Sequence, residues 1–207
     1  MFARFRFLVD RLPGRETALA RYGVPVADLS AEVAGRDVAL VGNARALAAG
    51  QSGGRIDAAG LVIRINRAPR PSALSHGTRT DWLALATSIG GDGLRRIGAT
   101  RHLWMSHKRK RLPFAVATSP GFYLHPLQAY DDLKKRLGAP PTTGLMLIDL
   151  LSMMEPRSVT LYGFDFMQSL SLTGSRTAAQ VPHDFAAEKA FVAALLARDP
   201  RFTICDG

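Results

Sequence analysis

Two asparagines that follow apolar runs are the first residues in this sequence whose types and spacing could do chemistry. Asn43 follows the run Asp37 to Gly42, and Asn66 follows the run Leu61 to Ile65; both runs read as buried strands. In an open parallel sheet, ligands bind beyond the carboxyl ends of the strands. An amide both donates and accepts hydrogen bonds, which suits a nucleobase or a ribose. The pattern predicts a nucleotide site, although a tight strand-to-helix turn would use the same residues.

The two common phosphate-binding signatures are absent from this stretch. Residues 50–54 are rich in glycine but have neither the GxGxxG spacing of dinucleotide-binding proteins nor the GxxxxGK[ST] phosphate loop. A Rossmann-like enzyme that uses a dinucleotide or S-adenosylmethionine should also have an acidic residue at the end of the second strand. Asp57 precedes that strand and Asn66 ends it, so we rank this class of enzyme lower.

The entry to an apolar helix is a second candidate site. Thr142, Thr143 and Gly144 follow two prolines and precede the apolar run from Leu145 to Met154. Prolines and hydroxyl residues are ordinary helix-entry residues, so capping alone explains them. The free amides of a helix amino terminus also bind anions. A ribose, a phosphate or a carboxylate would each suit this position.

His183 directly precedes a helix that we expect over residues 182–197. The amino-terminal dipole of that helix disfavours imidazolium, so a neutral ring could act as a general base. An isolated histidine is otherwise more often a capping or surface residue. Glu188 lies five positions further on, and five helical positions separate two side chains by about 140°. The pair can meet only if His183 lies outside the helix; otherwise Glu188 caps or orients backbone.

Strands that alternate with helices along the chain predict an α/β fold. Further strands are expected at residues 81–86, 102–106, 122–124, 158–162 and 202–205, short helices within residues 15–35, and a helix over residues 127–137 that Gly138 ends. Gly90, Gly91 and Gly93 are expected to break the chain between two strands, and residues 168–181 read as a loop. The prediction is a Rossmann-like three-layer α/β/α sandwich with a mostly parallel sheet.

The length of 207 residues predicts one domain over 1–207, with a helical extension at 1–36 before a core at 37–207. The single cysteine, Cys205, excludes an intrachain disulfide and fits a cytosol most easily. No apolar run approaches the ~20 residues of a membrane span. We therefore expect a cytoplasmic protein without a membrane anchor.

The net charge of +10 predicts anionic partners. The sharpest basic cluster consists of Lys108, Arg109, Lys110 and Arg111. This cluster either contacts an anion or the acceptor, or it is only a solvated loop. Aromatic residues do not interleave this cluster, so we do not expect a nucleic-acid partner. Residues 2–12 can form a helix with an apolar side and arginines at its edges. That apolar side either lies on the inner face of an anionic membrane or docks on the core of the protein.

Four blocks of sequence, taken in order, resemble the motifs of the animal-type sialyltransferases. They are Val41-Gly42-Asn43 with Ile56-Asp57 and Arg64 to Pro69 (the long motif), Gly77 to Thr80 (its continuation), Pro141 to Gly144 with Tyr162-Gly163-Phe164 (the short motif), and His183 with Glu188 (the final His-x4-Glu). The chain is similar to a short, anchor-less, bacterial-type member of that family.

The resemblance implies an inverting, metal-independent transfer of sialic acid from CMP-sialic acid to a hydroxyl of a glycan or glycolipid, such as a lipopolysaccharide or capsule glycan. Kdo, a related keto-sugar acid carried on CMP, is an equally open donor. The CMP-sugar is a substrate, so no cofactor and no metal are expected. His183 would be the general base, with Gly42 and Glu188 in support. The donor would bind Asn43, Asn66, Thr142, Thr143, Gly144, Gly163 and Phe164.

The sequence departs from the family in two places. The cysteine pair of the family aligns with Val38 and Pro156, and a histidine of the family is missing between residues 167 and 181. The leaving phosphate must then be held by other groups, namely the amides around Thr142 to Gly144 or the side chains of Ser169, Ser171, Thr173 or Arg176. The missing histidine also leaves open a catalytically inactive CMP-binding or glycan-binding module.

Overall fold

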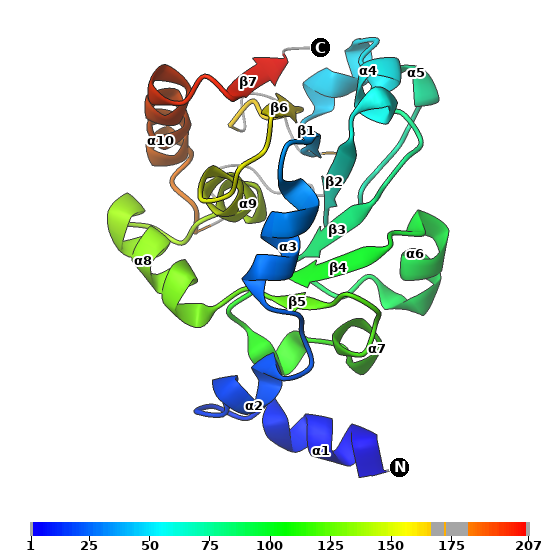
Figure 1. The fold of residues 1–207 in the computed structure, drawn as a ribbon, viewed down its shortest axis with the longest axis vertical. Helices are drawn as coiled ribbons and strands as arrows, with labels where there is room; N and C mark the ends of the chain where they lie inside the picture. Colours follow the sequence, from blue (N-terminus) through cyan, green and yellow to red (C-terminus); the bar gives the residue numbers. More distant parts are fainter. Residues whose placement is uncertain (1, 167–171, 173–181, 206–207) are drawn as a thin grey trace.

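Seven strands form a single sheet in the computed structural model, which describes residues 2–166, 172 and 182–205 (Figure 1). They are β1 (Asp37–Val41), β2 (Leu61–Ile65), β3 (Trp82–Leu85), β4 (Arg101–Trp104), β5 (Tyr123–Leu124), β6 (Ser158–Tyr162) and β7 (Phe202–Cys205). Their spatial order is β5-β4-β3-β2-β1-β6-β7, and every neighbouring pair is parallel. The prediction of a mostly parallel sheet is confirmed.

Helices and 3-10 turns precede and connect these strands. Those before β3 are α1 (Phe2–Asp10), α2 (Glu16–Ala20), α3 (Val26–Val33), η1 (Arg45–Ala49), α4 (Gly53–Ala58) and α5 (Ala73–His76). Those after β3 are α6 (Gly90–Ile97), η2 (Arg109–Arg111), α7 (Phe114–Ala117), α8 (Leu127–Leu137), α9 (Thr143–Ser152) and α10 (Phe185–Arg198). Within the described residues, no helix is long and apolar enough to cross a membrane.

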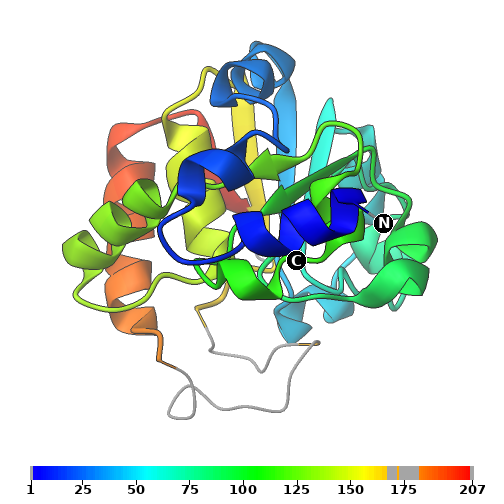
Figure 2. The ribbon, with the colours of Figure 1, turned by 90° about the horizontal axis from the view of Figure 1, so that it is seen from below.

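Successive residues of the central strands face two different cores, because side chains alternate across a sheet. Val38 and Leu40 of β1 pack in a core that α3, α8, α9 and α10 cover. Ala39 and Val41 face the opposite side, where η1 and α4 pack, and α6 and α7 cover that side beyond β3. Figure 2 shows the yellow-green to orange-red helices on one side of the strands and the cyan and green helices on the other. The predicted three-layer sandwich is confirmed.

The glycines before β4 do not break the chain as expected, since α6 begins at Gly90. Ile97 is buried and Leu94 packs against the same core, and this burial outweighs the cost of about 1 kcal/mol for each glycine in a helix. Gly98, at φ 69°, ends the helix in the left-handed conformation. Tertiary packing therefore decides this segment.

Most other boundaries follow the sequence pattern. The strands at residues 61–65, 158–162 and 202–205 and the helix at residues 127–137 begin and end as predicted, and Gly138 ends that helix at φ 72°. Strand β4 begins one residue early, and α10 begins at Phe185 rather than at residue 182. The expected loop over residues 168–181 lies outside the described residues, apart from Leu172.

The strand order reverses between β1 and β6, and the backbone segments that follow these two strands lie unusually close together there. The Gly42 amide donates to the Tyr162 carbonyl at 2.7 Å, and the Ala44 amide donates to the Gly163 carbonyl at 3.3 Å. A Cβ atom placed on Gly42 would lie 2.4 Å from the Gly163 carbonyl oxygen, inside van der Waals contact. Ligands of open α/β sheets bind at such a reversal, so the glycine contact marks the expected site.

We expect Gly42→Ala to destabilise the fold by about 1–3 kcal/mol, because the added methyl group meets backbone that cannot rotate away. The matched control is Gly54→Ala in α4, where an added Cβ meets nothing within 4 Å. That control should be neutral or slightly stabilising. Urea unfolding of both variants measures the difference. Equal stability of the two variants would contradict the close contact.

Candidate active site

The two predicted asparagines are neighbours at the carboxyl ends of β1 and β2. The Nδ2 of Asn43 donates to the carbonyl of Ile65 at 3.4 Å, directly before Asn66. The Oδ1 of Asn66 accepts the amide of Ala86 at 2.9 Å. Asn66 has φ 53°, a left-handed conformation that asparagine tolerates better than most residues. Both side chains are therefore held in place by backbone of the neighbouring strands.

The first turn of α9 lies against the end of β6. Thr142 is the N-cap, and its Oγ1 accepts the amide of Leu145 at 3.1 Å. A Cβ on Gly144 would lie 2.6 Å from Cε1 of Phe164, so the Phe164 ring rests directly on this glycine. The same ring lies close to Gly42, where an added Cβ would be 3.2 Å from Cδ2. Phe164 thus joins the ends of β1 and β6 to the amino terminus of α9.

Glu188 is buried in the first turn of α10 and binds the N-cap of α9. Its Oε1 accepts the amide of Thr142 at 2.6 Å, and its Oε2 accepts the hydroxyl of the same residue at 2.8 Å. Burial raises the pKa of Glu188 to about 7, although the two hydrogen bonds from Thr142 oppose the shift. Glu188 therefore orients the α9 entry, and its hydrogen bonds go to Thr142 rather than to His183, as one of the two sequence alternatives predicted.

His183 lies outside α10, since Asp184 is the N-cap and its carboxylate accepts the amide of Ala187 at 2.9 Å. The Nδ1 of His183 is 2.8 Å from the carbonyl oxygen of Pro140. A carbonyl only accepts, so the neutral ring carries its proton on Nδ1 and keeps a lone pair on Nε2. That tautomer can accept a proton at Nε2.

His183 and Glu188 together hold both ends of a short segment before α9. One binds the carbonyl of Pro140, and the other binds the amide and hydroxyl of Thr142. Sequence reasoning missed the role of Pro140, because a backbone carbonyl leaves no signal in residue type. The Pro140-Pro141 pair marked the helix entry but not a partner for the histidine.

The basic cluster is not part of this constellation. It follows β4, two strands away from β2 in the sheet order. Arg109 is buried and binds the Glu16 carboxylate and the carbonyls of Ser106 and His125. Its role is structural, so the expected anion contact passes to the exposed side chains of Lys108, Lys110 and Arg111.

The groups expected to hold a leaving phosphate include four side chains and the backbone amides at the start of α9. Ser169, Ser171, Thr173 and Arg176 lie outside the described residues. The amides of Thr143 and Gly144 lie in the first turn of α9, where backbone donors have no intrahelical acceptor. Within the described residues, no three His, Cys, Asp or Glu side chains come together as a metal site.

Two solved structures are similar to this chain over nearly its whole length. A mammalian sialyltransferase in complex with Gal-beta-1-3GalNAc-ortho-nitrophenol matches with a TM-score of 0.67 and 16% identity, over 100% of this chain and 86% of that chain. A second mammalian sialyltransferase structure matches with a TM-score of 0.68 and 16% identity, over 98% of this chain and 84% of that chain. The chain has a sialyltransferase-type fold. No protein-family model and no curated protein matches the sequence.

The sialyltransferase-type fold agrees with the resemblance drawn from the motifs. The matched motif residues end β1, begin α9, end β6 and precede α10. Four segments that are far apart in the sequence therefore meet at one edge of the sheet through the contacts of Gly42, Phe164, Glu188 and His183. The roles of these residues in binding and catalysis remain predictions.

Glu188 should make the stability of the sialyltransferase-type fold depend on pH. Its pKa is about 7 in the folded chain and near the ordinary 4.5 when unfolded, so between these values the unfolded chain loses its proton first. Folding stability therefore falls as pH rises through this window, by up to about 3 kcal/mol. Glu188→Gln removes the titration and keeps the size of the side chain.

The free energy of unfolding of Glu188→Gln, relative to that of the wild type, should therefore be larger at about pH 8 than at about pH 5, which means that the variant is relatively more stable at the higher pH. Urea titrations of both proteins at the two pH values measure this difference. A difference that does not change with pH would show that Glu188 has an ordinary pKa in the folded chain.

Proposed function

We propose that this chain is an inverting, metal-independent glycosyltransferase that moves a sialic acid, or the related acid Kdo, from its CMP donor to a hydroxyl of a glycan or glycolipid. The observation that carries the proposal is the hydrogen bond from His183 Nδ1 to the carbonyl of Pro140. It leaves Nε2 as a proton acceptor beside the first turn of α9. The similarity to the mammalian sialyltransferase structures supports the proposal at the level of the fold.

The donor would lie across the reversal point of the sheet. Asn43 and Asn66 would read the cytidine or its ribose, since each amide side chain is fixed by a backbone contact. Gly163 and Phe164 would form the adjoining wall. The amides of Thr143 and Gly144 would face the phosphate, because the amino terminus of a helix attracts negative charge.

The reaction would then be a single displacement. The oxygen of the acceptor hydroxyl attacks the anomeric carbon while its proton passes to Nε2 of His183. The bond between the anomeric carbon and the phosphate oxygen breaks, and its electron pair leaves with CMP. Attack opposite to the leaving group inverts the anomeric carbon. Backbone donors would balance the charge that grows on the phosphate.

Glu188 would act as a positioning residue. It touches neither donor nor acceptor in this scheme but fixes Thr142, which begins the helix that faces the phosphate. Because His183 binds Pro140 in the same segment, the base and the phosphate donors share one support. The acceptor would be a sugar, as in the related structure with a bound disaccharide derivative.

Binding of CMP and CTP should raise the melting temperature of the protein, whereas NAD and S-adenosylmethionine should not. A ligand that binds only the folded state stabilises it by mass action. The shift should persist in EDTA, since no metal is assigned to the site. Thermal melts with each nucleotide at equal concentration provide the measurement. An equal shift with NAD would contradict a cytidine site, and loss of the CMP shift in EDTA would contradict metal independence.

His183→Ala should lower the rate of transfer by about 10²–10⁴ while CMP binding and the fold are retained, because general-base catalysis contributes that much. Asn43→Ala should weaken CMP binding more than it lowers the turnover of bound substrate. Turnover with a water-soluble acceptor and calorimetric titration with CMP separate the two effects. The exposed His107 on the loop after β4 provides the control variant His107→Ala, which should leave both quantities unchanged.

Two results would contradict these roles. A His183→Ala protein with nearly wild-type turnover would show that another group takes the proton. A wild-type protein that binds CMP but releases none from any CMP-sugar, with or without glycan acceptors, would instead identify an inactive CMP-binding module.

A further inference from the structure

Helix α1 docks on the protein by one side and presents an apolar side to solvent. Phe7 is buried and packs edge-on against Tyr22 and Phe114, with ring centroids 5.4 and 5.3 Å apart. The exposed side chains of Phe2 (91%), Phe5 (68%) and Leu8 (52%) lie on the opposite side, within an arc of about 120° at 100° per residue. Sequence analysis left open whether α1 docks on the core or faces a membrane. The structure shows that α1 docks through the buried Phe7 and Asp10 and leaves Phe2, Phe5 and Leu8 exposed.

Arginines border this exposed apolar side. On the helical wheel, Arg4 lies beyond one edge and Arg6 beyond the other. Arg11 donates to the carbonyls of Lys110 and Leu112 at 2.9 and 2.7 Å, and so ties the end of α1 to the basic loop at residues 107–111. The helix and the loop thus form one surface, which we call the α1 surface and define as residues 2–25 and 107–111.

The α1 surface carries most of the net positive charge of the protein. It holds nine arginines and lysines and two acidic residues, which leaves seven of the ten net charges. Both carboxylates are already partnered: Asp10 accepts the hydroxyl of Tyr22 at 3.1 Å, and Glu16 binds the guanidinium of Arg109. The surface therefore has few negative charges to offset its arginines and lysines.

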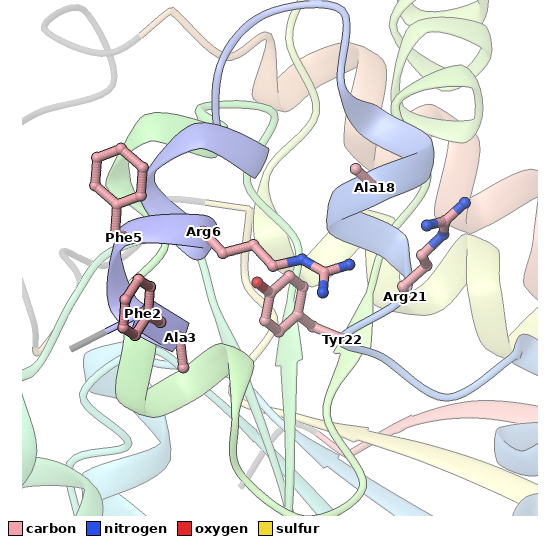
Figure 3. Close-up of a pocket in the computed structure, with 7 residues that line it drawn as sticks. All are labelled: Phe2, Ala3, Phe5, Arg6, Ala18, Arg21 and Tyr22. Carbon is pink, nitrogen blue, oxygen red and sulfur yellow. The ribbon is translucent and has the colours of Figure 1, made fainter.

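A cavity lies on each side of α1. One, of about 600 Å³, lies between α1 and α2; Arg6 and Arg21 line it together with Phe2, Phe5 and Tyr22 (Figure 3). Figure 3 shows Phe2 and Phe5 on α1 and the guanidinium of Arg6 reaching across to Tyr22. The other cavity, of about 590 Å³, lies between the end of α1 and the basic loop, where Arg11, Lys108, Lys110 and Arg111 line it. Each cavity combines cationic groups with apolar walls.

We propose that the α1 surface binds the face of an anionic lipid bilayer. Phe2, Phe5 and Leu8 enter the boundary between headgroups and acyl chains, as the apolar side of an interfacial helix does. Arg4, Arg6 and the basic loop contact lipid phosphates, and the two cavities accept headgroups. Anionic lipids attract such clusters of arginine and lysine at short range.

A bilayer fits this surface better than two other occupants. A second copy of the chain would bring two surfaces of net charge +7 together, and like charges at an interface are unfavourable. A nucleic acid would satisfy the arginines but would leave aliphatic side chains such as Leu8 without a partner. Only a lipid surface offers negative charge and an apolar layer to the same helix.

The bound orientation follows from the fold. The α1 surface lies at one end of the long axis, beside β4 and β5, and the basic loop follows β4 at the carboxyl edge of the sheet (Figure 1). The candidate active site occupies the same edge at β1 and β6. Docking therefore places the basic loop, at the carboxyl end of β4, against the lipid, and the candidate site lies three strands further along the same edge, at β1. The proposal concerns binding alone and does not depend on the proposed transferase activity.

Flotation of the full chain with lipid vesicles tests the proposal, with any tag placed at the carboxyl end. The protein should float with vesicles of phosphatidylcholine and phosphatidylglycerol in equal parts, and much less with phosphatidylcholine alone. The double variant Phe2→Ser/Phe5→Ser should bind at least about tenfold more weakly, since each aromatic side chain that leaves water contributes about tenfold to a partition constant. Lys110→Gln/Arg111→Gln should weaken binding by about thirtyfold, since each charge near an anionic surface contributes about fivefold.

Each variant has a matched control elsewhere on the surface. Leu74→Ser/Met153→Ser removes two apolar side chains that are 61% and 65% exposed, and Lys134→Gln/Lys135→Gln removes two exposed charges from α8. Both controls should bind as the wild type does. The proposal is overturned if the protein ignores anionic vesicles, if the controls lose binding equally, or if sedimentation shows a dimer that only the Phe2/Phe5 variant dissociates.

Discussion

The close approach of two glycines at the ends of β1 and β6 is the constraint on which the candidate site depends. With no side chain at Gly42, the end of β1 can hydrogen-bond along β6 as far as Gly163. Phe164 then follows at a position from which its ring covers both Gly42 and Gly144. The same approach leaves Asn43 beside the end of β2. A larger residue at position 42 would separate the two halves of the sheet at the point where the motif residues meet.

The segment before α9 depends on a second set of contacts, which come from one short stretch of α10 and its cap. His183 and Glu188 bind backbone groups only two residues apart, so the start of α10 fixes the start of α9. The histidine gains a defined tautomer from this contact, and the glutamate gains a raised pKa from its burial. Structural support and proposed chemistry are therefore provided by the same residues.

The sequence predicted best those parts of the fold that local pattern decides. Strand β2 is buried along its whole length and reads as a continuous apolar run. Strands β6 and β7 begin with alternating apolar and polar residues, as strands with one buried face do. It failed at α6, where burial of Ile97 outweighs the glycines. It also read Arg109 as an exposed cation, because its partner Glu16 is 93 residues away in the sequence. Such long-range partners, like the Pro140 carbonyl, carry no local signal.

The order of the strands also affects the path by which the chain folds. Strands β1 to β4 each pair with the next strand in sequence, whereas β6 must return to β1, where Ser158 binds Asp37 across 121 residues. Contacts between distant residues form slowly because closing a long loop costs entropy. We therefore expect β1 and β2, with their asparagines, to be in place before α9, β6 and α10 arrive. Nucleotide binding would then begin only when this last closure is complete, so a bound ligand would report that folding has finished.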